Sequence, residues 1–272
     1  MLLITGATGN IGSALLRELR AVQAGPLRAL TRDARATIPE AFEADLGHSA
    51  GLRRALDGVR SMFLVTGLGP DTEIISAARD AGVEQVVLVS SITVQTHPHL
   101  GPAAEKAAIE KELMASGMKW TILRPTQFAS NTLLWAEAIS SGRPVRAPYA
   151  DIALPTIHPA DIASVARVAL TEPGHHGRTY ALTGPEAVTP RQQVAAIGAA
   201  VDRDLPFTES TRDQARADLL PYFGAAVDAV LDVTGGDMTD ELRQVRDTVP
   251  ALTGRPGRTF RQWVAENAHL FQ

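Results

Sequence analysis

Residues 2–19 read LLITGATGNIGSALLREL, and this stretch decides the fold. Residues 2–5 form an apolar run typical of a buried strand, and the residues after the last glycine have the apolar spacing of a helix. Gly6, Gly9 and Gly12 lie between the two. Glycine has no Cβ, so it permits positive φ and close approach of another group to the backbone. The pattern predicts a tight strand-to-helix turn that begins an α/β domain.

The same turn predicts a phosphate site. Gly6 is expected to make the turn, Gly9 to let a phosphate approach the backbone, and Gly12 to let the helix pack near the strand. Free N–H groups and the positive end of the helix dipole favour a pyrophosphate there. An ordinary strand-to-helix turn is the alternative. The residues assigned to this dinucleotide site are Gly6, Thr8, Gly9, Asn10, Ile11 and Gly12.

Further apolar runs alternate with helix-period segments. These runs cover residues 27–31, 41–44, 61–65, 85–90 and 120–123. Strands that alternate with helices imply right-handed crossovers and a doubly wound α/β fold with a parallel sheet. The continuous runs MFLV and VVLVS suit strands that are buried on both faces.

The pattern becomes less regular after Pro125, where the sequence is richer in Pro and Gly. Residues 1–150 are expected to form the dinucleotide-binding domain, which also receives a segment from about residues 151–183. Short strands and helices in the last third of the chain predict a smaller C-terminal α/β lobe. Residues 184–272 are assigned to this lobe, which would serve a substrate or a partner.

Composition limits the classes of partner. The 272 residues are 45% hydrophobic and 21% charged, as in an ordinary globular protein. Thirty acidic and 26 basic residues give a net charge of −4, and no Lys/Arg block indicates a nucleic acid or a membrane. The sequence has no cysteine, which excludes thiolate chemistry and fits the cytoplasm. The first apolar run is too short for a signal peptide or a membrane span. We therefore expect a small-molecule or protein partner.

The end of the second predicted strand bears on the choice of nucleotide. In NAD-binding domains an acidic residue about 20 residues beyond the glycines binds the ribose 2′-hydroxyl. Here Thr31 and Arg32 stand at that place. Arg32, with Arg28 or Arg35 as a helper, matches a 2′-phosphate because a guanidinium offers a planar fork to phosphate oxygens. NADP(H) is favoured, but NAD(H) stays open because a shifted register brings Asp33 to the ribose. A solvated loop arginine is the alternative for Arg32.

Two residues after the third predicted strand are assigned to the adenosine end of the nucleotide. Asp45 is expected to accept a hydrogen bond from the adenine amino group, and Leu46 lies beside it. A role for Asp45 in capping the next helix is the alternative. No metal is expected: His97 and His99 alternate around Pro98 and offer only two ligands with no nearby acidic partner.

Several motifs, in order, resemble those of a known family. The sequence is similar to the NmrA-like branch of atypical short-chain dehydrogenases/reductases throughout most of its length. This resemblance implies a Rossmann domain that binds NADP(H) or NAD(H), with a small C-terminal lobe. Some members of the branch reduce quinones or azo compounds, whereas others bind the nucleotide without turnover and sense redox state. The motifs are ITGATGNIG, LTRDAR, ADL, VLVSS, WTILRPTQF, HPADIASVA and YALTGPEAVT.

The resemblance also implies catalytic positions. Ser90 falls in the region of the family's serine, and Thr93 lies just after it. Lys106 matches the lysine of the Tyr-x-x-x-Lys pair, which bonds the nicotinamide ribose; a solvated helix lysine is the alternative. Pro102 stands where the tyrosine would be, so the usual proton donor is absent.

Loops after the later strands should open at the carboxyl edge of the sheet, where α/β proteins bind ligands. Thr66 and Gly67 are placed beside the nicotinamide ribose, and Pro125 is expected to orient the chain toward the nicotinamide. The alternative for Tyr149 is that it is a packed or exposed aromatic residue in a loop, with no contact to the substrate. The residues assigned to the substrate are Gln127, Phe128, Asn131 and Tyr149.

These residues together predict an NADPH-dependent oxidoreductase that transfers hydride to a quinone-like or conjugated carbonyl molecule. The cofactor supplies the hydride, so such a reaction needs no tyrosine at Pro102. The same departure leaves two alternatives open. One is a non-catalytic NADP(H)-sensing protein with a protein partner, and the other is a redox-neutral isomerase or cyclase.

Overall fold

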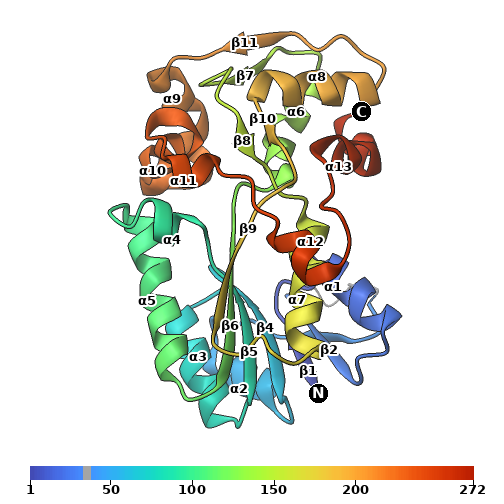
Figure 1. Ribbon diagram of the computed structural model, residues 1–272, viewed down its shortest axis with the longest axis vertical. Coiled ribbons are helices and arrows are strands. Elements are labelled where there is room, and N and C mark those ends of the chain that lie inside the picture. Colours follow the sequence, from blue (N-terminus) through green and yellow to red (C-terminus); the bar gives the residue numbers. More distant parts are fainter. Residues whose placement is uncertain (33–37) are drawn as a thin grey trace.

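The computed structural model describes residues 1–32 and 38–272. Asp33 and Arg35, which were considered at the nucleotide's ribose, lie outside the described residues. Figure 1 shows a larger α/β unit built around a sheet and a smaller lobe at the carboxyl end of its strands. Both chain ends are visible, the N-terminus at the bottom of the sheet and the C-terminus in the small lobe.

The described residues form a seven-stranded sheet in the order β3-β2-β1-β4-β5-β6-β9, with every neighbouring pair parallel. The strand order reverses between β1 and β4, and open α/β sheets bind ligands in the crevice outside such a point. The predicted doubly wound, Rossmann-like fold is confirmed. The strands are β1 (Leu2–Ile4), β2 (Leu27–Thr31), β3 (Ala41–Glu43), β4 (Ser61–Val65), β5 (Gln85–Val89), β6 (Lys119–Pro125) and β9 (Arg178–Leu182).

Helices cover both faces of this sheet (Figure 1). Leu15 of α1 packs with Phe63 and Val87 on one face, and Leu3, Met62 and Leu88 pack on the other. Because the central strands are buried on both faces, their sequences are continuously apolar. One face is covered by α1 (Asn10–Ala21), α7 (Pro159–Thr171) and α12 (Thr248–Thr253), and the other by α2 (Ser49–Leu56), α3 (Asp71–Asp80) and α5 (Gly101–Ala115).

The turn from β1 to α1 requires glycine at two places. Gly6 has a φ of +60°, in the left-handed region. A Cβ on Gly12 would lie 2.2 Å from the carbonyl oxygen of Gly6 and 2.8 Å from the Cα of Ala7. The helix therefore begins in direct contact with the turn, and no larger residue fits at position 12.

The smaller lobe is built from two separate parts of the chain. Strands β7 (Val145–Ala147) and β11 (Phe207–Glu209) pair parallel, and β8 (Leu154–Pro155) and β10 (Ala187–Val188) pair antiparallel. Between these segments the chain returns to the sheet as α7 and β9. The large unit and the lobe are thus interleaved along the sequence.

The lobe has its own core, in which Val145 and Ile197 pack with Phe260, Trp263 and Phe271. Helices η1, α6, α8, α13 and η4 contribute to that core, α9, η2 and α10 pack together in a separate cluster, and the remaining short helices lie between the lobe and the sheet (Figure 1). These helices are α4 (Thr93–Thr96), η1 (Ala129–Trp135), α6 (Ala136–Ser140), α8 (Pro190–Ala200), α9 (Arg212–Phe223), η2 (Gly224–Ala226), α10 (Val227–Leu231), η3 (Asp232–Gly236), α11 (Asp240–Arg243), α13 (Phe260–Asn267) and η4 (Ala268–Phe271). Within residues 1–32 and 38–272, no helix has the length and apolar character needed to cross a bilayer.

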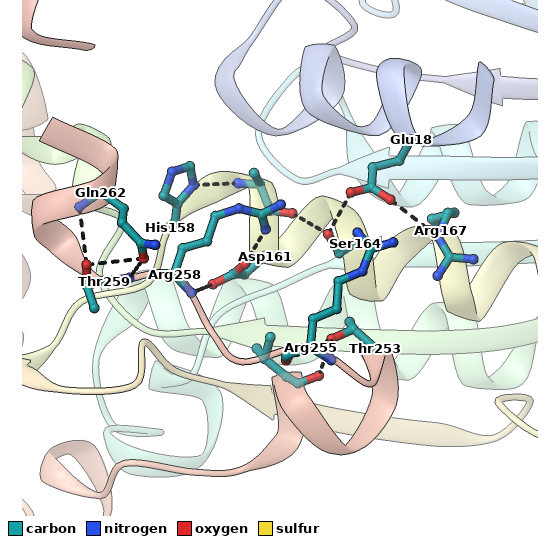
Figure 2. Close-up of polar contacts among 12 residues, drawn as sticks. Glu18, His158, Asp161, Ser164, Arg167, Thr253, Arg255, Arg258, Thr259 and Gln262 are labelled. Carbon is teal, nitrogen blue, oxygen red and sulfur yellow. Dashed lines mark hydrogen bonds and ion pairs between the residues drawn. The ribbon is translucent and has the colours of Figure 1, made fainter. Parts of the chain in front are cut away.

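Polar contacts hold the segment before α13 against α7 (Figure 2). Both oxygens of the buried Asp161 carboxylate accept hydrogen bonds from Arg258, one from the guanidinium at 2.5 Å and one from the backbone N–H at 2.7 Å. One turn further along α7, the Ser164 hydroxyl donates to Glu18 of α1 at 2.9 Å. Arg258 thus joins the segment before α13 to α7, and Ser164 joins α7 to α1.

His158 caps the N-terminus of α7 and makes the stability of the protein depend on pH. Its Nδ1 accepts from the Ala160 N–H at 3.0 Å, and its Nε2 lies 3.3 Å from the Glu266 carboxylate. Burial lowers the pKa of His158 below its usual 6.5, although the negative charges of Glu266 and Asp161 oppose this and Arg258 adds to it. His158 therefore binds a proton more readily in the unfolded chain than in the folded protein. As the pH falls below about 6.5, protonation of His158 favours the unfolded chain, and the free energy of unfolding decreases.

His158→Asn should reduce this pH dependence. Asparagine is a good helix cap, so the acceptor for Ala160 is kept while the titrating group is removed. We expect the melting temperature to fall less between about pH 7.5 and about pH 5.5 in the variant than in the wild type. Equal falls in both proteins would show that His158 does not cause the acid sensitivity.

Candidate active site

The first turn of α1 has the features of a phosphate cradle. Gly9 is the N-cap residue, with extended backbone (φ −81°, ψ 174°), and no side chain caps the helix. The first N–H groups of α1 are therefore available to an anion at the positive end of the helix dipole. Thr8 and Asn10 are exposed at the turn. Ile11 is buried in the core, so its contribution to a nucleotide would come from its backbone.

The predicted 2′-phosphate residue lies at the opening of a separate hollow. Arg32 is exposed directly after β2 and lines a hollow of about 610 Å³ together with Arg54 of α2. Arg28 has another role: its guanidinium donates to the carbonyls of Ala55 (2.6 Å) and Asp57 (2.8 Å) at the end of α2. The helper suggested by the structure is thus Arg54, from a helix that the sequence pattern did not connect with the nucleotide.

Asp45 and Leu46 differ in what they offer to an adenine. The Asp45 carboxylate accepts from the Gly47 N–H at 2.8 Å and lies 3.1 Å from the His48 ring. The Gly47 bond is the main reason why the pKa of Asp45 is lowered, with smaller effects from His48 and Arg32. Asp45 therefore supports the turn before α2 and also lines the hollow beside Arg32. The side chain of Leu46 is buried in the core.

A buried carboxylate shapes the loop after β4. Gly67 has a φ of +84°, and its N–H donates to Asp71 at 2.9 Å. Burial raises the pKa of Asp71, while the Gly67 N–H and the positive charge of Lys106 act in the opposite direction. The positive charge of Lys106 on α5 therefore acts on the same carboxylate that holds the Gly67 backbone. Asp71 was missed by sequence reasoning because an acidic residue in a first helical turn is common.

Ser90 and Thr93, which were predicted to lie near the hydride acceptor, follow β5 in the sequence. The Ser90 hydroxyl is buried and has no hydrogen-bond partner among the residues that the structure describes. Thr93 donates to the Ser91 hydroxyl at 2.9 Å. Pro102 lies in the first turn of α5, as the sequence implies, and Pro125 is buried at the end of β6.

Three of the four predicted substrate residues line one large cavity. Gln127, Phe128 and Asn131 are in the wall of a cavity of about 750 Å³ that also contacts Asn10 of the nucleotide-binding turn. Tyr149 is beside this cavity and not in its lining. Its ring packs against Gly235, and its hydroxyl accepts from Arg212 at 3.2 Å. Tyr149 therefore has the packed position that was the alternative for it.

Much of the cavity wall comes from the small lobe and was not identified from the sequence. These lining residues lie on η1, β10 and α9, far apart in the chain. A cluster of apolar residues, LLPYF, at the end of α9 was the available signal. The lobe residues of the wall include Leu133, Trp135, Val188, Leu219, Tyr222 and Phe223.

The histidines after β5 take part in a contact between the sheet and the lobe. His97 is fully buried, and its Nε2 donates to the Asp237 carbonyl at 2.7 Å. His99 lies 3.6 Å from the Asp237 carboxylate, a partner that is remote in sequence. Among the residues that the structure describes, no three His, Asp or Glu side chains are placed to hold a metal ion.

The fold and the glycine turn define a dinucleotide-binding α/β protein, and comparison with known proteins identifies its family. Residues 6–173 match the family described as NAD(P)H-binding, and the chain belongs to this family. The resemblance to the NmrA-like, atypical short-chain reductase superfamily is likewise confirmed.

Curated relatives span the full chain. It is 40% identical over 286 residues to a (4-alkanoyl-5-oxo-2,5-dihydrofuran-3-yl)methyl phosphate reductase of Streptomyces griseus, covering 100% of this chain and 99% of that protein. It is 33% identical over 284 residues to an NAD(P)H azoreductase of Xenophilus azovorans, with the same coverage. Among solved structures, the NADPH-dependent quinone oxidoreductase of Escherichia coli, complexed with NADPH, matches with a TM-score of 0.80 and 29% identity over 100% of both chains.

Proposed function

We propose that this protein is an NADPH-dependent oxidoreductase that transfers hydride to a quinone-like or conjugated carbonyl molecule. One observation carries this proposal: the large cavity includes Asn10 of the nucleotide-binding turn in its wall. A molecule in the cavity would therefore lie next to a nucleotide bound at α1. The reductase names of the full-length relatives support the same reaction type.

Each part of the nucleotide has a candidate binding residue. The N–H groups at the start of α1 would bind the pyrophosphate, and Arg32 would bind the 2′-phosphate. Lys106, near the Thr66–Gly67 loop, would bind the nicotinamide ribose. When bound, NADPH supplies the hydride, and the protein orients the acceptor. In this proposal the sheet unit holds the cofactor, and the interleaved small lobe holds the acceptor.

The acceptor's oxygens would be held by neutral groups. The side-chain amides of Gln127 and Asn131 line the cavity and can donate hydrogen bonds to a carbonyl. Hydride addition to a quinone leaves an oxyanion that water at the cavity opening can protonate, so a proline at position 102 is compatible with turnover. Ser90 would take part only after its buried hydroxyl rotates toward the cavity.

The proposed partners are small molecules, and the cytoplasm is the proposed location because the chain has no cysteine to oxidise. Steady-state turnover of NADPH with menadione tests the function. Loss of many equivalents of reduced-nicotinamide absorbance per protein is expected. NADPH binding without any loss would favour a redox sensor, whereas an altered metabolite without NADPH loss would favour an isomerase or cyclase.

Arg32→Ala should weaken the binding of NADPH and leave that of NADH nearly unchanged. A charged hydrogen bond to phosphate contributes about 1.5–3 kcal/mol, so the Kd for NADPH should rise at least about tenfold. Fluorescence titrations of both nucleotides measure this. Arg53→Ala removes the same charge from an exposed position on α2 and serves as the control. Equal weakening of both nucleotides by Arg32→Ala would remove Arg32 from the 2′-phosphate site.

A further inference from the structure

Apolar side chains make up most of the wall of the 750 Å³ cavity, and the charged side chains among its described lining residues are exposed to solvent. Three of the described lining residues are charged: Glu137, Arg146 and Asp218. Each has a partner, since Arg146 lies 3.3 Å from Asp218 and Glu137 lies 2.7 Å from Arg143. Their side chains are 47–82% exposed. These groups therefore form a solvated rim, and no described lining residue places an unpaired positive charge deeper inside.

The cavity is larger than a single quinone needs. At roughly 30 Å³ per water molecule, 750 Å³ corresponds to about 25 waters, so one or two fused rings would leave much of it unfilled. The lining residues on η1, β10 and α9 place part of the cavity in the small lobe. Its wall there is formed by Leu133, Trp135, Val188, Leu219 and Phe223, which we call the tail wall.

We propose that the natural acceptor is an uncharged molecule with an extended apolar tail, and that the tail wall binds this tail. The inference rests on the proposed reductase function and specifies its substrate class. Burial of apolar surface against the tail wall would contribute to the binding of each added methylene. A charged group on the tail would lose its hydration without gaining a free cationic partner, which is strongly unfavourable.

The charges at the rim bear on which group the end of the tail can carry. The Streptomyces griseus relative is named for a substrate that carries its phosphate on a ring methyl group and has a separate, uncharged alkanoyl chain. Here the lining charges at the rim are two carboxylates and one guanidinium, and the guanidinium of Arg146 is already paired with Asp218. Because Arg143 also pairs with Glu137, the rim charges balance, and a phosphate at the end of a tail would meet no unpaired cation among the described lining residues. We expect this protein to prefer the neutral tail.

The test is a series of naphthoquinones whose alkyl tail is lengthened one carbon at a time, with one member also made as a terminal phosphate ester. The kcat/KM for NADPH oxidation should rise by up to about fourfold for each buried methylene, mainly through KM. The phosphate ester should fall at least about tenfold below its neutral counterpart. A flat series or a preferred phosphate ester, with menadione still turned over, would overturn this inference alone. Failure of every quinone, menadione included, would overturn the proposed function and this inference with it.

Two variants on α9 locate the tail. Leu219→Trp places a larger side chain in the space beside the tail wall and should make kcat/KM depend less on tail length. Leu220→Trp makes the same change at the next residue, which is 44% exposed and outside the lining, and should keep the wild-type dependence. If thermal melting shows that Leu219→Trp is unfolded, Leu219→Gln keeps the volume, adds polarity and should make the dependence shallower. An unchanged dependence in a folded Leu219 variant would contradict the assignment.

Discussion

Gly12→Ala is expected to destabilise the protein by about 3 kcal/mol or more and to abolish nucleotide binding. The added Cβ would lie 2.2 Å from the Gly6 carbonyl oxygen, so either α1 or the turn must move. Overpacking of this kind commonly costs 1–3 kcal/mol, and here the obstacle is backbone that cannot rotate away. For a chain of this size the melting temperature should fall by about 6 °C or more.

Gly101→Ala is the matched control for this variant. Gly101 begins α5, and a Cβ there would meet nothing within 4 Å. Thermal unfolding followed by circular dichroism, with NADPH titration of the same samples, measures both effects. A Gly12→Ala protein with wild-type melting and binding would mean that the turn does not have this close packing.

Gly9→Val is expected to leave the fold intact and to weaken both NADPH and NADH by at least about a hundredfold. Gly9 has an extended backbone that valine adopts readily, and its Cβ would lie 3.3 Å from the Gly6 carbonyl oxygen, a tight but adjustable contact. The methyl groups would, however, occupy the space beside the first N–H groups of α1. The pyrophosphate could then no longer approach the backbone.

Gly9→Ala tests whether the loss of binding depends on side-chain size, because the single methyl group of alanine should weaken nucleotide binding less than valine does. Fluorescence titration gives the Kd values, and the melting temperature without nucleotide shows that the fold is kept. If folded Gly9→Val bound both nucleotides as tightly as the wild type, the glycine turn would not be the pyrophosphate site. Gly9 and Gly12 thus separate the two reasons for glycine in this motif: room for the ligand and room for the chain itself.

Six strands of the sheet could be predicted because each carries its own local signal, whereas β9 (Arg178–Leu182) was not among the predicted runs. The runs at residues 62–65 and 86–89 are apolar throughout, since helices cover both sides of these strands in the folded protein. The turn at Gly6 was equally readable, because a left-handed backbone and a close helix contact both select glycine. Asn10 in this turn and Gln127, Phe128 and Asn131 after β6 line one cavity, because chain order determines which edge of a parallel sheet they reach.

The tail wall could not be predicted, because its residues share no local pattern. Leu133, Val188 and Leu219 come from segments separated by dozens of positions, and the apolar character of each is equally suited to a core. The roles of charged residues were also set by tertiary contacts. The guanidinium of Arg28 donates hydrogen bonds to carbonyls at the end of α2. The Asp161 carboxylate accepts a hydrogen bond from Arg258, which lies nearly a hundred positions away in the sequence.

The measurement that tests the central claim most directly is the rate of NADPH oxidation when the transferable hydrogen at C4 of its nicotinamide is replaced by deuterium. The protein is loaded with labelled or unlabelled NADPH and mixed rapidly with the naphthoquinone that gives the highest kcat/KM. Direct hydride transfer in the cavity beside Asn10 predicts a slower single turnover with the label. NADPH that binds but is not oxidised in either form would contradict the claim that this protein is a reductase.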